Sequence, residues 1–167
     1  MTTISPASVR AAVAAVVDPE IRVVTIEELG ILRSVAVADD GRTVVTITPT
    51  YSGCPAMDVI RADVAAAARA SGAVDVEVRT VLSPPWSTDD INETGRRKLA
   101  KAGIAPPVAS IGAPVLMQIG RGPSAGPRCP RCGSVDTTEL SRFGSTACKA
   151  LWRCRACREP FDHIKGF

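Results

Sequence analysis

The sequence predicts a mixed α/β domain followed by a small metal-binding β-ribbon. Three observations support this. Helical and strand-like hydrophobic periods alternate through residues 1–105, a stretch rich in Pro, Gly, Ala and Ser spans 106–127, and two Cys-x-x-Cys pairs follow it. We therefore expect an α/β (α+β) sandwich with a small mixed sheet, in the order α-β-β-α-β-α, and a C-terminal zinc ribbon in residues 128–167.

The first helix is predicted from Ser5-Pro6, a cap followed by a proline in the first turn, to about Val17. Asp18 precedes a proline and is disfavoured in a helix, so the helix should end there. Residues 25–30 form a turn closed by Gly30. The later predicted elements are strands at 31–38 and 43–48 joined by a turn at 39–41, a helix from 57 to about 72, a strand at 74–79, and a helix at 89–102 capped by Thr88.

Composition places the chain among globular proteins. Its 167 residues are 46% hydrophobic and 22% charged, which excludes wholesale disorder. No apolar run approaches the roughly 18 residues of a membrane span, and the first residues do not resemble a secretory signal. We expect a cytoplasmic protein, in which six cysteines are better explained by metal than by disulfides.

Charge also differs between the two parts of the chain. Residues 1–105 carry eleven Lys/Arg against thirteen Asp/Glu, whereas residues 106–167 carry nine against four. The net charge of +3 is too small to indicate nucleic acid by itself. A cationic rim around the cysteine pairs favours an acidic protein partner over nucleic acid, since few aromatic residues are available for base stacking.

The two cysteine pairs are Cys129/Cys132 and Cys154/Cys157, with 21 residues between Cys132 and Cys154. This spacing is typical of four thiolates around one zinc ion. A rubredoxin-like iron site has a similar Cys-Pro-x-Cys-Gly turn, and four cysteines without metal are a third reading. A closed four-thiolate site has no open position for substrate, so a structural metal is favoured over a catalytic one.

Cys54 and Cys148 belong to neither pair. Cys54 follows a predicted strand and precedes Pro55 at a predicted helix start, so it is a candidate N-cap whose thiolate the helix dipole would favour. A buried structural cysteine is equally compatible with the spacing. Asp18 and Glu20 are candidate neighbours of this loop, although such carboxylates are usually solvated. For Cys148, a small buried side chain is favoured over an exposed ligand.

The sequence offers few groups for catalysis. His163 is the only histidine and lies near the C-terminus, so no Ser-His-Asp or Cys-His set is available. No phosphate-binding glycine motif is present either. These observations favour a non-catalytic protein.

Several segments together resemble a known family. They are Asp18-Pro19-Glu20-Ile21, Leu29-Gly30-Ile31, residues 48–57, residues 83–89, Gly95-Arg96-Arg97-Lys98-Leu99, residues 103–107, and residues 143–151 with both cysteine pairs. Nearly the whole chain resembles the D-type component family of the phenylacetate-degradation system (PaaD, also called PaaJ). The N-terminal domain is similar to the iron–sulfur assembly domain of SufT-type proteins.

The resemblance implies an accessory or maturation component of the phenylacetyl-CoA ring-epoxidising monooxygenase, whose reductase carries flavin and a [2Fe–2S] cluster. It implies help with iron–sulfur cluster delivery or insertion, most plausibly into that reductase, through a transient cluster. In related domains the loop cysteine that matches Cys54 is suspected of contacting iron, and Cys148 lies in a strongly matching segment. Asp18 and Glu20 complete the candidate transfer residues.

Three competing functions are a structural adaptor of the oxygenase that handles no iron, a redox subunit with iron in the four-cysteine site, and a nucleic-acid-binding protein. Partners are expected to be the reductase, other epoxidase subunits or the assembly machinery. A homodimer is also compatible, because assembly domains often pair.

Overall fold

A computed structural model describes residues 5–107 and 126–166. The described residues form two compact units that divide between Gly95 and Arg96, and each unit has its own sheet. This division falls inside a helix and earlier than residue 105, where the sequence places the domain boundary. Most of the predicted linker 106–127 lies outside the described residues, so the predicted domain limits stay a prediction.

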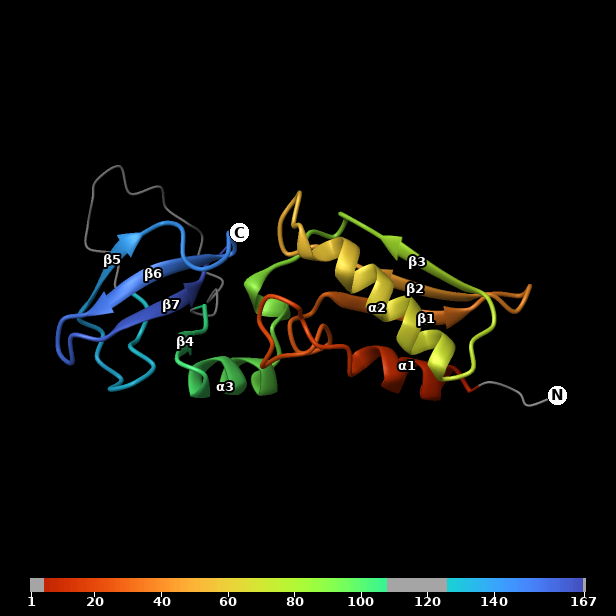
Figure 1. The fold of residues 1–167 in the computed structure, drawn as a ribbon, viewed down its shortest axis with the longest axis horizontal. Coiled ribbons are helices and arrows are strands. Elements are labelled where there is room, and N and C mark those ends of the chain that lie inside the picture. Colours follow the sequence, from red (N-terminus) through yellow and green to blue (C-terminus); the bar gives the residue numbers. More distant parts are fainter. Residues whose placement is uncertain (1–4, 108–125, 167) are drawn as a thin grey trace. The chain divides into compact units, whose positions relative to one another are not determined.

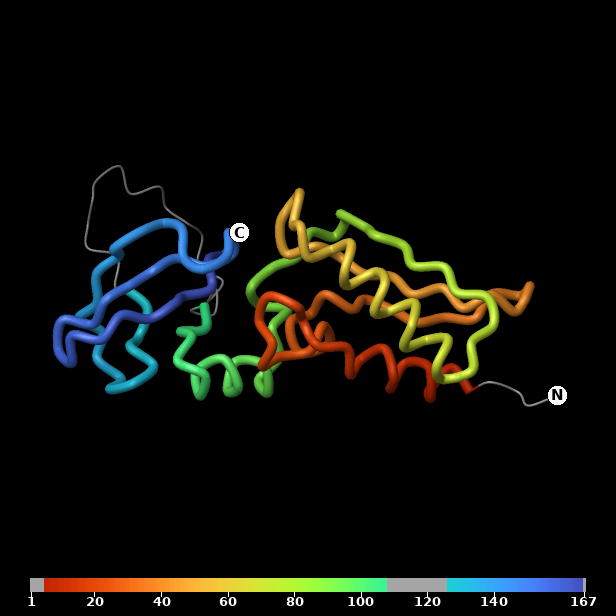
Figure 2. The backbone as a smooth tube through the Cα atoms, in the orientation of Figure 1, coloured from red at the N-terminus to blue at the C-terminus, as the bar shows by residue number. Residues whose placement is uncertain are grey.

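The first unit packs two helices on one face of a three-stranded sheet (Figure 1). Helices α1 (Pro6–Ala14) and α2 (Ala56–Ala70) cover β1 (Leu32–Val37), β2 (Thr43–Ile47) and β3 (Val76–Thr80). The spatial order is β1-β2-β3. β1 and β2 form an antiparallel hairpin, while β2 and β3 are parallel and α2 makes the crossover between them (Figure 2).

Alternation along β2 builds the core of this unit. Val45 and Ile47 are fully buried, whereas Val44 and Thr46, which alternate with them, are partly exposed. Helix α2 buries Ile60 and Val64 at helical spacing. The apolar face of the strand and the apolar face of the helix, both predicted from the sequence, therefore pack together in one layer between helices and sheet.

Helix α1 ends at Ala14, three residues earlier than the predicted end at Val17. Val17 instead forms an isolated antiparallel bridge with Thr25. Asp18 is buried and its carboxylate accepts the backbone N–H groups of Glu20 at 2.9 Å and Ile21 at 2.6 Å. The local turn made by this carboxylate competes with helix, which explains the early end.

The predicted helix 89–102 is split in two. A short 3-10 turn, η1 (Thr88–Asp90), precedes α3 (Glu93–Lys101). Ser87 rather than Thr88 caps η1, because its hydroxyl accepts the Asp89 amide and a capping box forms with Asp90. The predicted cap at Thr88 is therefore wrong by one residue.

The second unit contains a four-stranded sheet in the order β4-β7-β6-β5. Its strands are β4 (Ile104–Ala105), β5 (Thr137–Ser141), β6 (Lys149–Cys154) and β7 (Pro160–Ile164). The strands β5, β6 and β7 form an antiparallel meander, and β4 adds a short parallel strand to β7. The predicted mixed α+β fold with small mixed sheets and a ribbon region is confirmed.

Among the described residues, no helix combines the length and the apolar character that crossing a membrane requires.

Candidate functional site

The four paired cysteines converge at one end of the ribbon sheet. The sulfur atoms of Cys129, Cys132, Cys154 and Cys157 all lie within 4.8 Å of one another. Sγ of Cys129 lies 3.8 Å from that of Cys157, and Sγ of Cys132 lies 3.5 Å from that of Cys154. Four sulfurs bound tetrahedrally at about 2.3 Å from a metal are separated by about 3.8 Å. The sulfur geometry therefore fits one tetrahedral metal ion.

Two similar turns position these sulfurs. In each, the backbone N–H of the first cysteine donates to a carbonyl five residues later, Cys129 to Ser134 at 2.9 Å and Cys154 to Glu159 at 3.0 Å. The residue after each second cysteine has a left-handed backbone, with φ of 75° at Gly133 and 67° at Arg158. Glycine adopts this conformation without steric cost, whereas arginine does not.

The backbone and the neighbouring thiols also change the pKa values of the clustered cysteines. The Cys157 amide donates to Sγ of Cys154 at 3.5 Å. This contact and the neighbouring Cys132 thiol lower the pKa of Cys154 to about 7. For Cys157 the Glu159 amide lowers the pKa, but burial and the neighbouring cysteine thiols outweigh it and raise the pKa to about 12. The cluster therefore favours a thiolate at Cys154 and a thiol at Cys157, and metal binding must release the remaining protons.

Cys54 lies two residues before the first residue of α2, not at its cap. Pro55 is the N-cap residue, with helical φ and ψ of −68° and −21°, and no side chain caps the helix. The predicted N-cap role of Cys54 is therefore wrong. Proline already has the φ of the first turn, so the helical geometry begins at Pro55 and leaves Cys54 in the loop. The carbonyl of Cys54 still accepts the Met57 amide at 3.3 Å.

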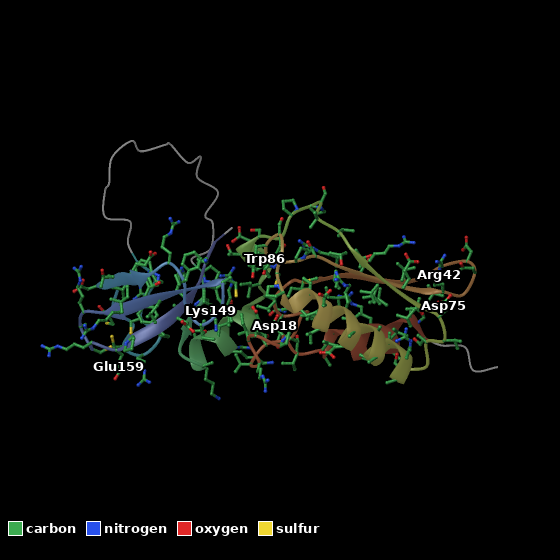
Figure 3. All side chains as sticks on the ribbon, turned by 45° about the horizontal axis from the view of Figure 1, so that its top comes forward. Asp18, Arg42, Asp75, Trp86, Lys149 and Glu159 are labelled. Carbon is green, nitrogen blue, oxygen red and sulfur yellow. The ribbon has the colours of Figure 1, made fainter. Side chains whose placement is uncertain are left out.

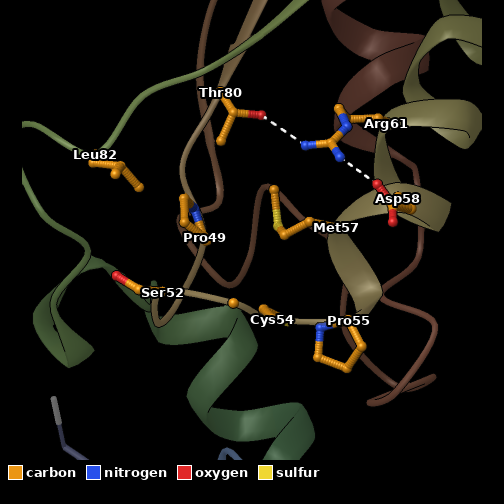
Figure 4. A pocket seen from close by; sticks show the side chains of 10 residues that line it. Pro49, Ser52, Cys54, Pro55, Met57, Asp58, Arg61, Thr80 and Leu82 are labelled. Carbon is orange, nitrogen blue, oxygen red and sulfur yellow. Dashed lines mark hydrogen bonds and ion pairs between the residues drawn. The ribbon is translucent and has the colours of Figure 1, made fainter.

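Cys54 lines an open hollow of about 430 Å³ at this end of the sheet (Figure 4). The wall opposite the loop is formed by Thr80, the last residue of β3, and by Leu82, which lies two residues further along the chain. Arg61 of α2 donates to the Thr80 hydroxyl at 3.2 Å and pairs with Asp58. The carboxyl ends of the parallel strands β2 and β3 meet here, which is where α/β sheets commonly place ligands.

The structure brings Asp18 and Glu20 near Cys54, as expected from the sequence. Burial raises the pKa of the Cys54 thiol, the backbone amide of Ala56 opposes this, and the negative charges of Glu20 and Asp18 reinforce it. The lowered pKa expected from the helix dipole is therefore wrong. The neutral thiol is favoured because desolvation and two carboxylates outweigh the helix amides.

Asp18 and Trp86 have structural roles at the same end of the first unit, while Arg42 and Asp75 lie at its opposite end (Figure 3). Asp18 is the acceptor that closes the turn after α1. The buried Trp86 donates its indole N–H to the Leu29 carbonyl at 2.7 Å. Trp86 is thus a core residue, as large aromatic side chains usually are.

Cys148 lies in the second unit, in the approach to β6. Its side chain is buried, with 7% exposed, and its sulfur lies 3.1 Å from the Thr146 hydroxyl. His163 is half-buried and its ring nitrogen Nδ1 lies 3.2 Å from the Ala105 carbonyl, where burial lowers the pKa of the imidazole. Neither residue belongs to the four-cysteine cluster.

Arg61, Thr80 and Leu82 are neighbours of Cys54 that the sequence patterns do not single out. Arg61 lies seven residues after Cys54, on the first two turns of α2, so helical spacing indicates that it can reach back towards the loop. Thr80 and Leu82 come from a distant segment, and only the parallel pairing of β3 with β2 places them here.

Two family profiles match separate parts of the chain. The iron–sulfur cluster assembly protein family matches residues 6–80, and the PaaD zinc β-ribbon domain matches residues 117–165. The first contains the sheet, both covering helices and Cys54. The second contains all four clustered cysteines.

Proteins similar to this chain agree with both matches. A protein of Escherichia coli (strain K12), named as the putative D component of 1,2-phenylacetyl-CoA epoxidase, is 43% identical over 169 residues, which cover 99% of this chain and 97% of that protein. The Fe-S protein maturation auxiliary factor YitW of Bacillus subtilis (strain 168) is 40% identical over 78 residues, 46% of this chain and 76% of that protein.

Solved structures resemble the N-terminal part. A domain of unknown function from Bacillus anthracis has a TM-score of 0.51 at 30% identity, covering 56% of this chain and 90% of that one. A conserved hypothetical protein of Thermotoga maritima has a TM-score of 0.50 at 25% identity, covering 59% and 97%. With its iron–sulfur assembly domain, its PaaD zinc ribbon and its near full-length similarity to the E. coli protein, this chain belongs to the PaaD family of phenylacetyl-CoA epoxidase components.

Proposed function

We propose that this protein is a non-catalytic, cytoplasmic accessory factor of a phenylacetyl-CoA epoxidase system that helps to load an iron–sulfur cluster into a client protein, with the reductase as the foremost client. Two independent similarities support this. The full-length relative is named as an epoxidase subunit, and the relatives of the N-terminal half are named as Fe-S protein maturation auxiliary factors.

The placement of Cys54 is the observation that carries the proposal. It is the cysteine that lies in the assembly-like unit, and it is partly exposed in an open hollow rather than sealed in the core. A ligand for cargo must let the cargo leave, so an exposed single thiol suits transfer better than a closed four-thiolate site. We assign Cys54 as a transient ligand of iron or of a cluster, with Asp18 and Glu20 as neighbouring carboxylates.

The proton on Cys54 sets a condition for this transfer. Because the folded environment raises the pKa of the thiol, binding of iron must be accompanied by loss of that proton to solvent. The positive charge of an incoming ion or cluster would offset the two carboxylates that disfavour the free thiolate. The empty site thus stays a thiol, and the cargo itself favours the ligating form.

We assign the ribbon cluster a structural zinc ion, held by the cysteines at 129, 132, 154 and 157. Four thiolates fill the coordination sphere of zinc, so the ion would stabilise the turns and offer no open position. Metal analysis of anaerobically purified protein tests this assignment. We expect a colourless protein with about one zinc per chain, and a red protein with one redox-active iron in these cysteines would contradict it.

Replacement of Cys54 tests the transfer role. A Cys54→Ala strain should make a folded, metal-containing protein yet leave the [2Fe–2S] content of the client reductase well below the wild-type level. Ser52→Ala is the matched control, because it removes a small polar side chain from the same hollow without removing a thiol. Cys148→Ala tests the second candidate thiol separately. A wild-type [2Fe–2S] content of the reductase in the Cys54→Ala strain would show that Cys54 takes no part in cluster transfer.

A structural adaptor is the second candidate, and the raised pKa of Cys54 is the observation that favours it, since a protonated thiol binds metal poorly. An adaptor predicts stable co-purification with oxygenase subunits and no effect of Cys54→Ala on cluster content. The same strains therefore separate the two functions.

A further inference from the structure

A second hollow, of about 390 Å³, lies on the ribbon, and half of its lining residues are arginines. Its lining residues are Thr138 and Leu140 of β5, Arg153 and Cys154 of β6, and Arg155 and Arg158 of the second cysteine turn. We propose that this basic groove is a docking surface for an acidic segment of a partner protein, one that carries an apolar side chain among its carboxylates. The proposal concerns a surface separate from Cys54 and does not depend on cluster transfer.

The arginines leave the groove with unbalanced positive charge. Arg155 pairs with Asp136 at 3.6 Å, but both side chains are more than 60% exposed, so this pair contributes little and readily exchanges partners. Nε of Arg153 donates to the Arg158 carbonyl at 3.2 Å, which consumes one of its five N–H donors. Three guanidinium groups around one hollow can each hold a carboxylate in bidentate geometry.

The groove also has an apolar component. Leu140 is 52% exposed and lines the groove. It belongs to β5, which pairs with β6 on one side and with no described strand on the other. A bulge between Glu139 and Ser141 interrupts the pairing at Leu140, and such bulges re-aim side chains at sheet edges. An occupant with carboxylates alone would leave this leucine in water.

Charge and composition together favour protein over nucleic acid as the occupant. Among the described residues, none that lines the groove is aromatic, whereas single-stranded nucleic acid is bound by base stacking on aromatic residues. Residues 126–166 carry eight Lys/Arg against four Asp/Glu, a balance that attracts an acidic partner and speeds its association.

Anisotropy of a fluorescein-labelled peptide tests the surface on the full-length, metal-loaded protein. The probe is a twelve-residue peptide of alternating glutamate and leucine, and a second peptide replaces each leucine by serine at the same charge. We expect the Glu/Leu peptide to bind more tightly than the Glu/Ser peptide. An Arg153→Ser/Arg155→Ser variant should weaken Glu/Leu binding at least tenfold.

Matched variants separate a groove from general electrostatic attraction. Arg131→Ser/Arg142→Ser removes the same charge from the same unit outside the lining residues and should change affinity less than twofold. Leu140→Ser should weaken the Glu/Leu peptide only. Metal content of each variant is measured in parallel. If a serine variant has lost metal, arginine-to-lysine substitutions at the same positions are used instead. Lysine keeps the positive charge but cannot hold a carboxylate in bidentate geometry.

Three results would overturn the proposal. Equal loss in both double variants would mean that net charge alone attracts the peptide. Equal affinity for the Glu/Leu and Glu/Ser peptides would show that the groove makes no apolar contact with its occupant. Tighter binding of a twelve-nucleotide single strand, lost in Arg153→Ser/Arg155→Ser, would assign the groove to nucleic acid instead.

Discussion

Cys54 shows how a single thiol is tuned by its surroundings and not by helix position. Pro55 takes the cap of α2, so the cysteine receives only part of the benefit of the helix amides. Desolvation and the carboxylates of Glu20 and Asp18 act in the other direction. The balance favours a neutral thiol that becomes a ligand only when a cation compensates the local negative charge.

Removal of the Glu20 charge should make Cys54 more reactive. In Glu20→Gln the pKa of Cys54 falls, so more thiolate is present at pH 7.5 and alkylation by iodoacetamide accelerates about two- to threefold, as expected for one partly screened charge. Mass spectrometry of the Cys54 peptide measures the rate. Glu27→Gln is the control, because Glu27 pairs with Arg10. An unchanged or slower rate in Glu20→Gln would contradict the electrostatic account.

The same pKa shift sets a pH dependence with a defined sign. Folding favours the neutral thiol, so its contribution to the free energy of unfolding is complete below the pKa of the unfolded cysteine and is lost as pH rises through the folded value. Cys54→Ala should therefore flatten the decline in stability on the alkaline side, above the ordinary cysteine range. Denaturant titrations of both proteins across that pH range measure the difference, and parallel declines would contradict it.

At the level of elements, two turns depend on backbone conformation. Gly30 closes the turn before β1 with φ of 73°, and a Cβ there would lie 2.5 Å from Cβ of Asp90 in η1. The turn also offers the Leu29 carbonyl to Trp86. The second is the cysteine turn after Cys157, where Arg158 has the conformation that Gly133 has in its counterpart.

Gly30→Ala should lower the free energy of unfolding by about 2–4 kcal/mol, because it combines backbone strain with overpacking against η1. Gly41→Ala is the matched control. Gly41 also has positive φ, of 84°, but no atom of the described part of the chain lies within 4 Å of its Cβ position, so only about 1 kcal/mol is expected. Denaturation followed by Trp86 fluorescence in a Trp152→Phe background measures both. Equal losses would show that the contact with Asp90 is unimportant.

Arg158→Gly should stabilise the ribbon by about 1 kcal/mol, since it relieves a left-handed conformation at a non-glycine residue. Gly133→Ala should have the opposite sign at the equivalent position, where none of the described residues crowds the added Cβ. The rate of metal loss to a chelator reports both changes. Faster loss from Arg158→Gly than from wild type would contradict this account.

At the scale of the whole molecule, the two units are stabilised in different ways. The first has a continuous apolar layer between α1, α2 and the sheet. The second has a small buried cluster made of Ala105, Cys129, Cys154 and Phe161, two of which belong to the four-cysteine cluster. The ribbon segment 126–166 has only about forty residues, and a segment of this size seldom folds on so small a core without a metal.

Metal removal should therefore unfold one unit and spare the other. After chelation of the metal at pH 6, hydrogen exchange should lose protection in β5, β6 and β7 while β1, β2 and β3 remain protected. The acidic pH assists removal, because protons compete with metal for thiolate ligands. Simultaneous loss of protection in both sheets would show that the first unit also depends on the ion.

The sequence by itself determined most elements of the first unit and the four-cysteine cluster, because both depend on local spacing. Hydrophobic periods indicate the helices and strands to within a few residues, and two Cys-x-x-Cys turns bring paired sulfurs together wherever they fold. The errors lie where side chains compete with the helical backbone, at Asp18 after α1 and at Ser87 before α3.

Only the tertiary structure decided the surroundings of Cys54 and the composition of the ribbon unit. The hollow beside Cys54 requires β3 to pair in parallel with β2, which brings Thr80 and Leu82 from a segment about thirty residues away. The ribbon unit gains β4 because Ile104 and Ala105 pair with β7, some sixty residues later. Such long-range pairings set the burial and the local charge on which a thiol pKa depends, and spacing along the chain carries no record of them.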